Sequence, residues 1–225
     1  MHTRPLLTLA LAGVASVIAA GPAFAQKSKD TLRVAFRSPI RTVDLYHDPK
    51  PESALAGRTV YDGLVYYDEK AKKFRPLLAK SWKKTGPSSF EFELRDDVKW
   101  HDGEAFDADD VVYTVNWLIS PKTKLRTKRD YAWIGKVEKA GLHKVRITGK
   151  RNFAPAMMRF AYSMFIMPEH LHGKMKKKSS FGRKSPVGTG PYKVLSVNKN
   201  KGIVAVRHDA YNHGGTWKPK TNIKR

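Results

Sequence analysis

The chain carries eight histidines, the side chains best suited to metal binding or proton transfer near neutral pH. Two pairs lie close in sequence: His170 with His172, and His208 with His213. A stable metal site needs three or four ligands held by supporting hydrogen bonds, so two imidazoles do not make one. Because His170 and His172 follow Pro168, we expect both in a surface turn. The sequence therefore predicts no metal site and no cofactor.

Motifs for enzymatic chemistry are missing from the sequence. It contains no Gly-x-Ser-x-Gly elbow, no His-Glu-x-x-His pair and no Gly-rich phosphate loop. The chain has no cysteine, which excludes thiolate nucleophiles, disulfides and Cys-based zinc sites. Asp96 and Asp97 are adjacent acids, but they fall in a turn where we expect them to be solvated. We therefore interpret the protein as a non-enzyme.

The first 25 residues have the pattern of a secretory signal peptide. Arg4 gives a positive start, residues 6–20 are apolar and uncharged, and Ala23-Phe24-Ala25 places small residues at the positions that a signal peptidase recognises. The apolar run is shorter than the ~20 residues that a membrane-spanning helix needs. We predict cleavage after Ala25 and export of the mature chain.

The charge of the chain is strongly positive. Its 43 basic and 20 acidic residues give a net charge of +23, with local clusters over residues 122–129 and 174–178. Such a surplus attracts anions over about one Debye length. No nucleic-acid-binding motif accompanies the lysines, and export also speaks against a nucleic-acid partner. We expect a solvated basic surface; binding of an anionic surface remains an alternative.

Apolar periodicity predicts the elements that carry these residues. The clearest helix is capped by Asp107, has Val111, Val115 and Leu118 at helical spacing, and ends at Pro121. Alternation predicts strands over residues 31–36, 90–94, 144–148, 192–197 and 203–207, with hairpins over 81–94 and 192–207. We also expect a short helix running into a strand over 52–66, partial helix over 153–171 and a basic linker over 174–184.

Strands and helices mix without the regular alternation of a doubly wound sheet, so the predicted fold class is α+β. In the central hairpin we expect Phe90, Phe92 and Leu94 to face the core, and Glu91 and Glu93 to face water. Gly103 should supply the positive φ of a tight turn, and Gly188 and Gly190 should allow close approach of a neighbouring backbone.

Three stretches of this sequence resemble the family-5 extracellular solute-binding proteins, which serve peptide and nickel ABC importers. The first is Tyr-Asp-Gly-Leu-Val over residues 61–65, with Pro-Leu-Leu-Ala-Lys-Ser-Trp over 76–82. The second runs over residues 90–103 and continues through Phe106 to the capped helix at 108–113. The third is Val-Gly-Thr-Gly-Pro-Tyr over 187–192, followed by a hairpin and then Tyr211 and Asn212.

The resemblance implies a two-lobed fold of the periplasmic binding protein type II kind, of which this chain has only the first lobe, with an inserted smaller domain. Residues 26–65 and 184–225 then form the incomplete first-lobe domain, and residues 66–183 the inserted domain. In the family the second lobe follows the stretch that ends here at Arg225, so we expect it to be absent.

The resemblance also implies where a solute is held. In peptide-binding members the first lobe contributes the loop before the Tyr-Asp-Gly-Leu-Val stretch and an aromatic region after the capped helix. An extended peptide needs an anion for its amine and a cation for its carboxylate; we expect Asp48 and Lys50 to serve these two charges. The candidate ligand-binding residues are Tyr46, His47, Asp48, Lys50, Tyr131 and Trp133.

The function implied is that of a periplasmic, monomeric binding component that delivers a peptide or similar small solute to an ABC transporter permease in the inner membrane. Two alternatives stay open. The chain is a truncated remnant without a function of its own, or it is a basic protein that binds anions or surfaces.

Overall fold

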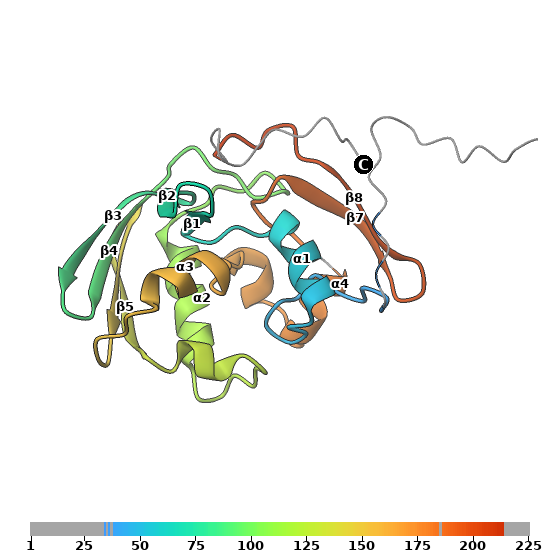
Figure 1. Ribbon diagram of the computed structural model, residues 1–225. Coiled ribbons are helices and arrows are strands. Elements are labelled where there is room, and N and C mark those ends of the chain that lie inside the picture. Colours follow the sequence, from blue (N-terminus) through green and yellow to red (C-terminus); the bar gives the residue numbers. More distant parts are fainter. Residues whose placement is uncertain (1–33, 35, 37, 185, 214–225) are drawn as a thin grey trace, which may run out of the picture.

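The computed structural model describes residues 34, 36, 38–184 and 186–213, and shows a mixed α/β fold. A four-stranded sheet forms one side, helices fill the middle, and a separate hairpin forms the other side (Figure 1). The fold class predicted from the sequence is confirmed. In chain order the elements are α1 (Pro51–Val60), β1 (Val65–Asp68), β2 (Lys73–Pro76), β3 (Ala79–Gly86), β4 (Ser89–Leu94), α2 (Ala108–Ile119), η1 (Lys128–Tyr131), β5 (Ile134–Gly141), β6 (Lys144–Gly149), α3 (Ala156–Tyr162), η2 (Glu169–Gly173), η3 (Lys178–Ser180), α4 (Phe181–Lys184), β7 (Tyr192–Asn198) and β8 (Gly202–Arg207).

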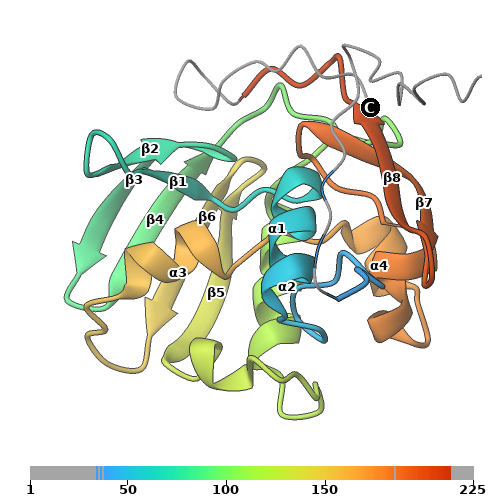
Figure 2. The ribbon, with the colours of Figure 1, turned by 45° about the vertical axis from the view of Figure 1, so that its right-hand side comes forward.

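The main sheet is antiparallel throughout, in the order β3-β4-β6-β5. Phe92 pairs with Val145 and Phe90 with Ile147 across β4 and β6, so four apolar side chains share one face. The Phe160 ring of α3 covers that face, with its centroid 5.5 Å from Phe90 and 4.9 Å from Phe92. Helix α2 packs against β5 and β6 on the same side, and the two helices close the core (Figure 2).

The outer face of the sheet corrects one expectation from the sequence. Glu93 is partly exposed as predicted, but Glu91 is only 6% exposed. Its carboxylate lies 3.0 Å from Lys83 on β3 and 2.7 Å from Arg146 on β6. These two neighbours cover the acid, and their hydrogen bonds hold the pKa of the Glu91 carboxyl below its usual value. Alternation alone does not reveal such a charge ladder across three strands.

Helix α2 begins and ends where the sequence predicts. The Asp107 carboxylate accepts from the Asp109 N–H at 2.7 Å, and Asp110 reaches back to the Asp107 N–H, which completes a capping box. Asp110 also accepts from the Trp100 indole at 3.1 Å and from the Glu169 N–H at 2.8 Å. Burial raises the pKa of the Asp110 carboxyl to about 6. One acid thus ties α2 to the turn before it and to η2.

Several other predictions are confirmed, and some are wrong. The predicted helix that runs into a strand corresponds to α1 and β1, and the predicted hairpins correspond to β3-β4 and β7-β8. The basic linker over 174–184 is instead a short helical segment, because Phe181 within it is buried against the Tyr61 and His172 rings. Strands β2 and β5 were missed. The predicted strand over 31–36 lies outside the described residues except for Val34 and Phe36, which are in coil.

One hydrophobic cluster runs through the molecule, from Val43 before α1 to Phe181 in α4. It includes side chains on both sides of the predicted domain boundary at residue 65, and the division into two domains stays a prediction. The predicted signal peptide lies outside the described residues. Within the described part of the chain, no helix is both long and apolar enough to cross a bilayer.

Two glycines join the hairpin side of the molecule to α1. A Cβ on Gly188 would lie 1.9 Å from the Val60 carbonyl oxygen, and one on Gly190 would lie 2.7 Å from it. The Gly190 N–H donates to that same carbonyl at 2.9 Å. The close approach predicted from the sequence is confirmed, as is the positive φ of Gly103 at 98°.

Because the backbone is packed so closely here, we expect that adding one methyl group at Gly188 destabilises the fold strongly. We expect Gly188→Ala to lower the free energy of unfolding by about 3 kcal/mol, because the Val60 carbonyl belongs to the backbone and must move. Urea unfolding of the purified protein measures the loss. Gly86→Ala is the matched control, since its Cβ meets nothing nearer than 3.7 Å. Equal stability of the two variants would contradict the account.

Candidate functional site

The loop over residues 42–50 leads into α1 and is organised by Asp44. The Asp44 carboxylate accepts from the backbone N–H of Tyr46 at 2.9 Å and of His47 at 3.0 Å, and it pairs with His47 Nδ1 at 2.7 Å. The loop is also anchored from outside, because the Val43 N–H donates to the Gly182 carbonyl at 3.0 Å. These bonds fix the backbone of the loop without help from a ligand.

Beneath this loop lies a group of rings. Tyr46 meets Trp117 of α2 at 5.1 Å and Tyr131 of η1 at 5.9 Å between ring centroids. Trp117 also contacts His47 at 6.0 Å and His172 at 4.6 Å. We call Tyr46, Trp117, Tyr131 and His172 the aromatic cluster. Edge-to-face ring contacts of this kind make a rigid platform.

The structure brings the predicted ligand-binding residues together only in part. Tyr46 and Tyr131 are buried, and their hydroxyls donate to the carbonyls of Phe165 at 2.5 Å and Ser163 at 2.6 Å. Trp133 is buried elsewhere, stacked on Phe153 with centroids 5.0 Å apart.

The other three candidates lie at the surface of the loop. His47 and Asp48 are half-buried and Lys50 is exposed. Asp48 accepts from the Ser53 hydroxyl at 3.2 Å, which orients one oxygen of its carboxylate. The assignment of all six residues to a solute site stays a prediction, in which Asp48 and Lys50 are the members that offer charge to the outside.

His172 was expected in a surface turn and is instead 2% exposed. Its Nδ1 lies 2.6 Å from the Tyr113 hydroxyl, and the rings of Trp117 and Phe181 cover it. Burial, and then the nearby Lys178 ammonium, lower the pKa of His172 to about 3. A proline before a histidine does not predict this burial, because the burial depends on Tyr113 and Trp117 of α2, which is remote in sequence, and on the packing of Phe181 in α4.

A second polar group joins the C-terminal loop to the junction of glycines. His213 Nε2 lies 2.9 Å from the buried Asp62 carboxylate, and His101 accepts from the Gly188 N–H while its Nε2 bonds the Gly190 carbonyl at 2.9 Å. Burial lowers the pKa of His101 to about 4. These histidines form hydrogen bonds with other groups of the protein. In the part of the chain that the structure describes, no three His, Asp or Glu side chains are placed to hold a metal ion.

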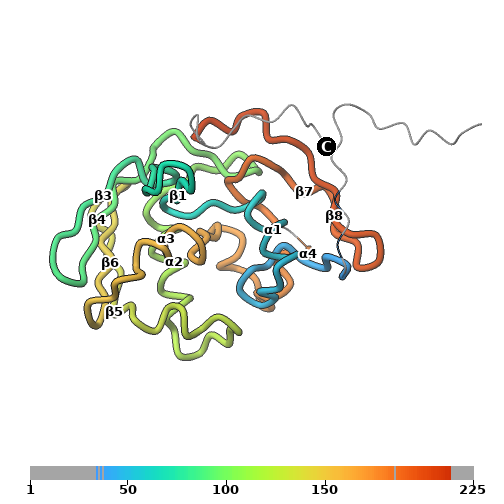
Figure 3. The backbone as a smooth tube through the Cα atoms, in the orientation of Figure 1, coloured from blue at the N-terminus to red at the C-terminus, as the bar shows by residue number. Residues whose placement is uncertain are grey.

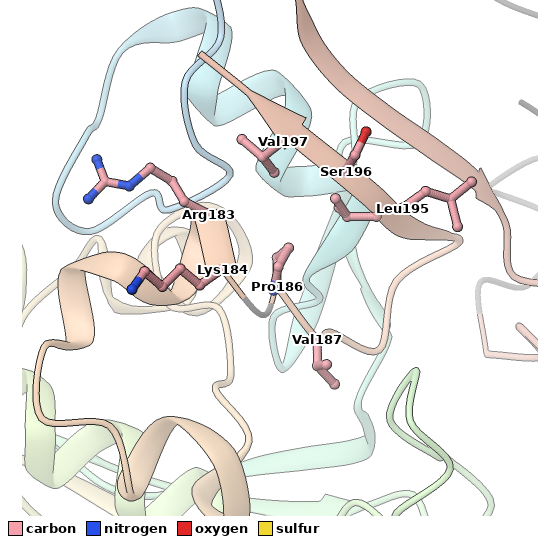
Figure 4. A pocket seen from close by; sticks show the side chains of 8 residues that line it. Arg183, Lys184, Pro186, Val187, Leu195, Ser196 and Val197 are labelled. Atoms are coloured by element: carbon pink, nitrogen blue, oxygen red, sulfur yellow. The ribbon is translucent and has the colours of Figure 1, made fainter.

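Two shallow hollows lie away from the loop. One of about 190 Å³ lies between α4 and β7 and is lined by Arg183, Lys184, Pro186, Val187 and four residues of β7; in Figure 4 the charged ends of Arg183 and Lys184 point away from β7. The other, of about 210 Å³, is lined by Asp97, Lys99, His208, Ala210, Asn212 and His213. Neither includes a predicted ligand-binding residue.

Comparison with known proteins decides the family. Residues 73–225, more than half of the chain, match the model described as bacterial extracellular solute-binding proteins, family 5, middle. The chain belongs to this family. The motifs over residues 90–113 and 187–192 lie within the match, so the resemblance noted from the sequence is confirmed.

Relatives of this family-5 chain include the glutathione-binding protein GsiB of Salmonella paratyphi A, 31% identical over 95% of the chain. The chain spans 42% of that relative's length. Among solved structures, the oligopeptide-binding protein AppA of Bacillus subtilis with a nonapeptide is 26% identical, with a TM-score of 0.72 over 77% of this chain and 35% of that one. NikZ of Campylobacter jejuni with Ni(L-His) is 30% identical, with a TM-score of 0.72 over 82% of this chain and 36% of that one.

The burial of His172 predicts how acid affects the family-5 chain. An imidazole in an unfolded chain protonates near pH 6.5, whereas His172 stays neutral in the folded state down to about pH 3. The unfolded state binds more protons between these values, so lowering the pH through this window removes stability. We expect His172→Gln to remove about 2 kcal/mol of the stability difference between about pH 7 and about pH 4.5.

Urea unfolding at the two pH values measures this effect. The matched control is His170→Gln, two residues away, where the imidazole is only half-buried and pairs with Asp102 at the surface. The assignment would be contradicted if the stability difference between the two pH values were the same in His172→Gln as in the wild type, and smaller in His170→Gln.

Proposed function

We propose that this chain is the first-lobe part of an exported solute-binding protein that captures a peptide or similar small solute for an ABC transporter. The observation that carries the proposal is the family match, together with the peptide ligands of two of the three relatives described above. GsiB is named for glutathione, and AppA was solved with a nonapeptide. Both ligands are peptides, although they differ in length, so a peptide is the best supported solute class.

The loop over residues 42–50 supports the same proposal in physical terms. Its backbone is fixed by Asp44 and by Gly182, so little conformational entropy is lost there when a ligand binds. Asp48 offers a carboxylate to a peptide amine, and Lys50 offers an ammonium to a peptide carboxylate. The buried rings of Tyr46 and Tyr131 serve as the floor that holds the loop in place.

The partners follow from the same proposal. A solute-binding protein of this kind closes around its ligand by a hinge motion and presents it to a permease. We infer that residues beyond the first lobe provide the opposing wall, since the relatives are more than twice as long as this chain. Export through a cleaved signal peptide, a periplasmic location and a monomeric state belong to this proposal.

The proposal predicts saturable peptide binding that depends on Asp48. We expect the purified, exported protein to bind glutathione or trialanine in titration calorimetry, and Asp48→Asn to weaken binding by about tenfold, because a charged hydrogen bond to the peptide amine is lost. Asp209→Asn is the matched control, since Asp209 is an exposed acid that pairs with Arg207 at 2.6 Å on the hairpin side.

Two results would contradict the proposal. No saturable binding of any peptide would favour the alternatives of a remnant or a surface-binding protein. Peptide binding that is equally strong in Asp48→Asn and Asp209→Asn would keep the solute class and remove Asp48 from the site.

A further inference from the structure

Some exposed cations of this chain form ion pairs with carboxylates, and others form none. On the outer face of the sheet and its edges, Lys83, Lys136, Lys139, Lys144 and Arg146 each lie within 3.0 Å of a carboxylate oxygen. Exposed cations that form no ion pair with a described carboxylate occur over much of the chain, for example Lys80, Lys84 and Lys150, and six of them lie on two short segments, 122–126 and 174–177. We call these six the basic collar: Lys122, Lys124, Arg126, Lys174, Lys176 and Lys177.

The collar lies on two segments that flank the loop over residues 42–50. One follows α2 and the other follows η2; both lie at the same end of the molecule as the loop, in two views related by a turn about the vertical axis (Figures 1 and 2). The tube in Figure 3 shows the segment after α2 at the lower end of that helix, and the loop next to the orange segment below α1 and α4. The aromatic cluster explains this placement, because Trp117 contacts both His47 and His172.

Just after each collar segment, one lysine donates hydrogen bonds to backbone carbonyls of the protein itself. Lys128 donates to the Leu118 carbonyl at 2.8 Å and to the Ser120 carbonyl, which fixes the segment after α2. Lys178 donates to the His172 carbonyl at 2.7 Å and to the Gly173 carbonyl at 3.0 Å, which fixes the segment after η2. Bonded in this way, the backbones keep the collar cations beside the loop.

Few acids lie near the collar, and the one beside its second segment is Glu169 at the start of η2, whose carboxylate lies against Gly173. Asp130, the one acid between Ser120 and Tyr131, lies 3.2 Å from Arg159. Asp44 is engaged by His47 at 2.7 Å, and no acid occurs between Gly173 and Lys184. Asp48 is therefore the carboxylate that remains at the surface of the loop, with Lys50 two residues away.

We propose that the solute of this protein is an anion, with the chemistry of a short peptide that carries more carboxylates than amines. The inference rests on the proposed function and adds the sign of the solute's charge. Asp48 receives the single amine, and Lys50 with the collar provides a positive potential for the excess carboxylates. Such a potential raises the association rate and the affinity of anions and disfavours cationic peptides.

The test is titration calorimetry of the purified, exported protein with Ala-Glu-Glu, Ala-Gln-Gln and Ala-Lys-Lys at low salt. We expect the affinity order acidic, neutral, basic, and a loss of the difference at about 1 M salt, where the Debye length is ~3 Å. The double variant Lys124→Glu/Arg126→Glu should weaken Ala-Glu-Glu roughly tenfold and leave Ala-Gln-Gln nearly unchanged. Lys80→Glu/Lys84→Glu, with the same change of charge on exposed positions of β3, should affect neither.

Each other outcome overturns the inference in a distinguishable way. Equal affinity for the three peptides in the wild type keeps peptide binding and removes the preference for anions. Equal weakening by the collar and β3 variants assigns the effect to net charge and not to the collar. Absence of binding to any peptide removes both proposals. Binding of the wild type, but not the collar variant, to phosphatidylglycerol vesicles, with no peptide preference, makes the collar a membrane contact instead.

Discussion

The structure depends on the contact between the Val60 carbonyl and the two glycines that precede β7. This carbonyl ends α1, accepts from the Gly190 N–H at 2.9 Å and leaves no room for a side chain on Gly188. His101 joins the same point from the turn after β4, through two backbone-linked hydrogen bonds. Three segments far apart in sequence thus meet at one place. The position of α1, and with it the loop that leads into α1, follows from this packing.

From that junction the chain builds a platform and not a closed cavity. The loop over residues 42–50 rests on buried rings, and its backbone donors are satisfied by Asp44. Its surface offers charges of both signs, and the basic collar lies on the segments that follow α2 and η2. This arrangement suits one wall of a two-lobed receptor, in which a solute is fixed in place by groups already positioned before it binds. On the main sheet, by contrast, Glu91 and Glu93 form ion pairs with cations of neighbouring strands.

Much of the fold could be predicted from the sequence, because it is encoded locally. The capping box at Asp107, the alternation over residues 90–94 and the turn at Gly202 act within a few residues, and the structure confirms the helix and hairpins they predict. Strand β5 was missed because only Ile134 and Val137 of its eight residues are buried. The burial of Glu91, His172 and Phe181 depends on partners from other segments, which no local pattern contains. For the site, the sequence indicated the loop, but the roles of its residues depend on a solute and on the opposing lobe.

Hydrogen–deuterium exchange of the exported protein, with and without a saturating peptide, tests the central claim most directly. The account predicts that the backbone amides of residues 42–50 become protected when peptide binds, while those of β3 and β4 stay unchanged. Saturable peptide binding that leaves this loop unprotected, and instead protects the hollow beside β7, would contradict the placement of the solute on the loop.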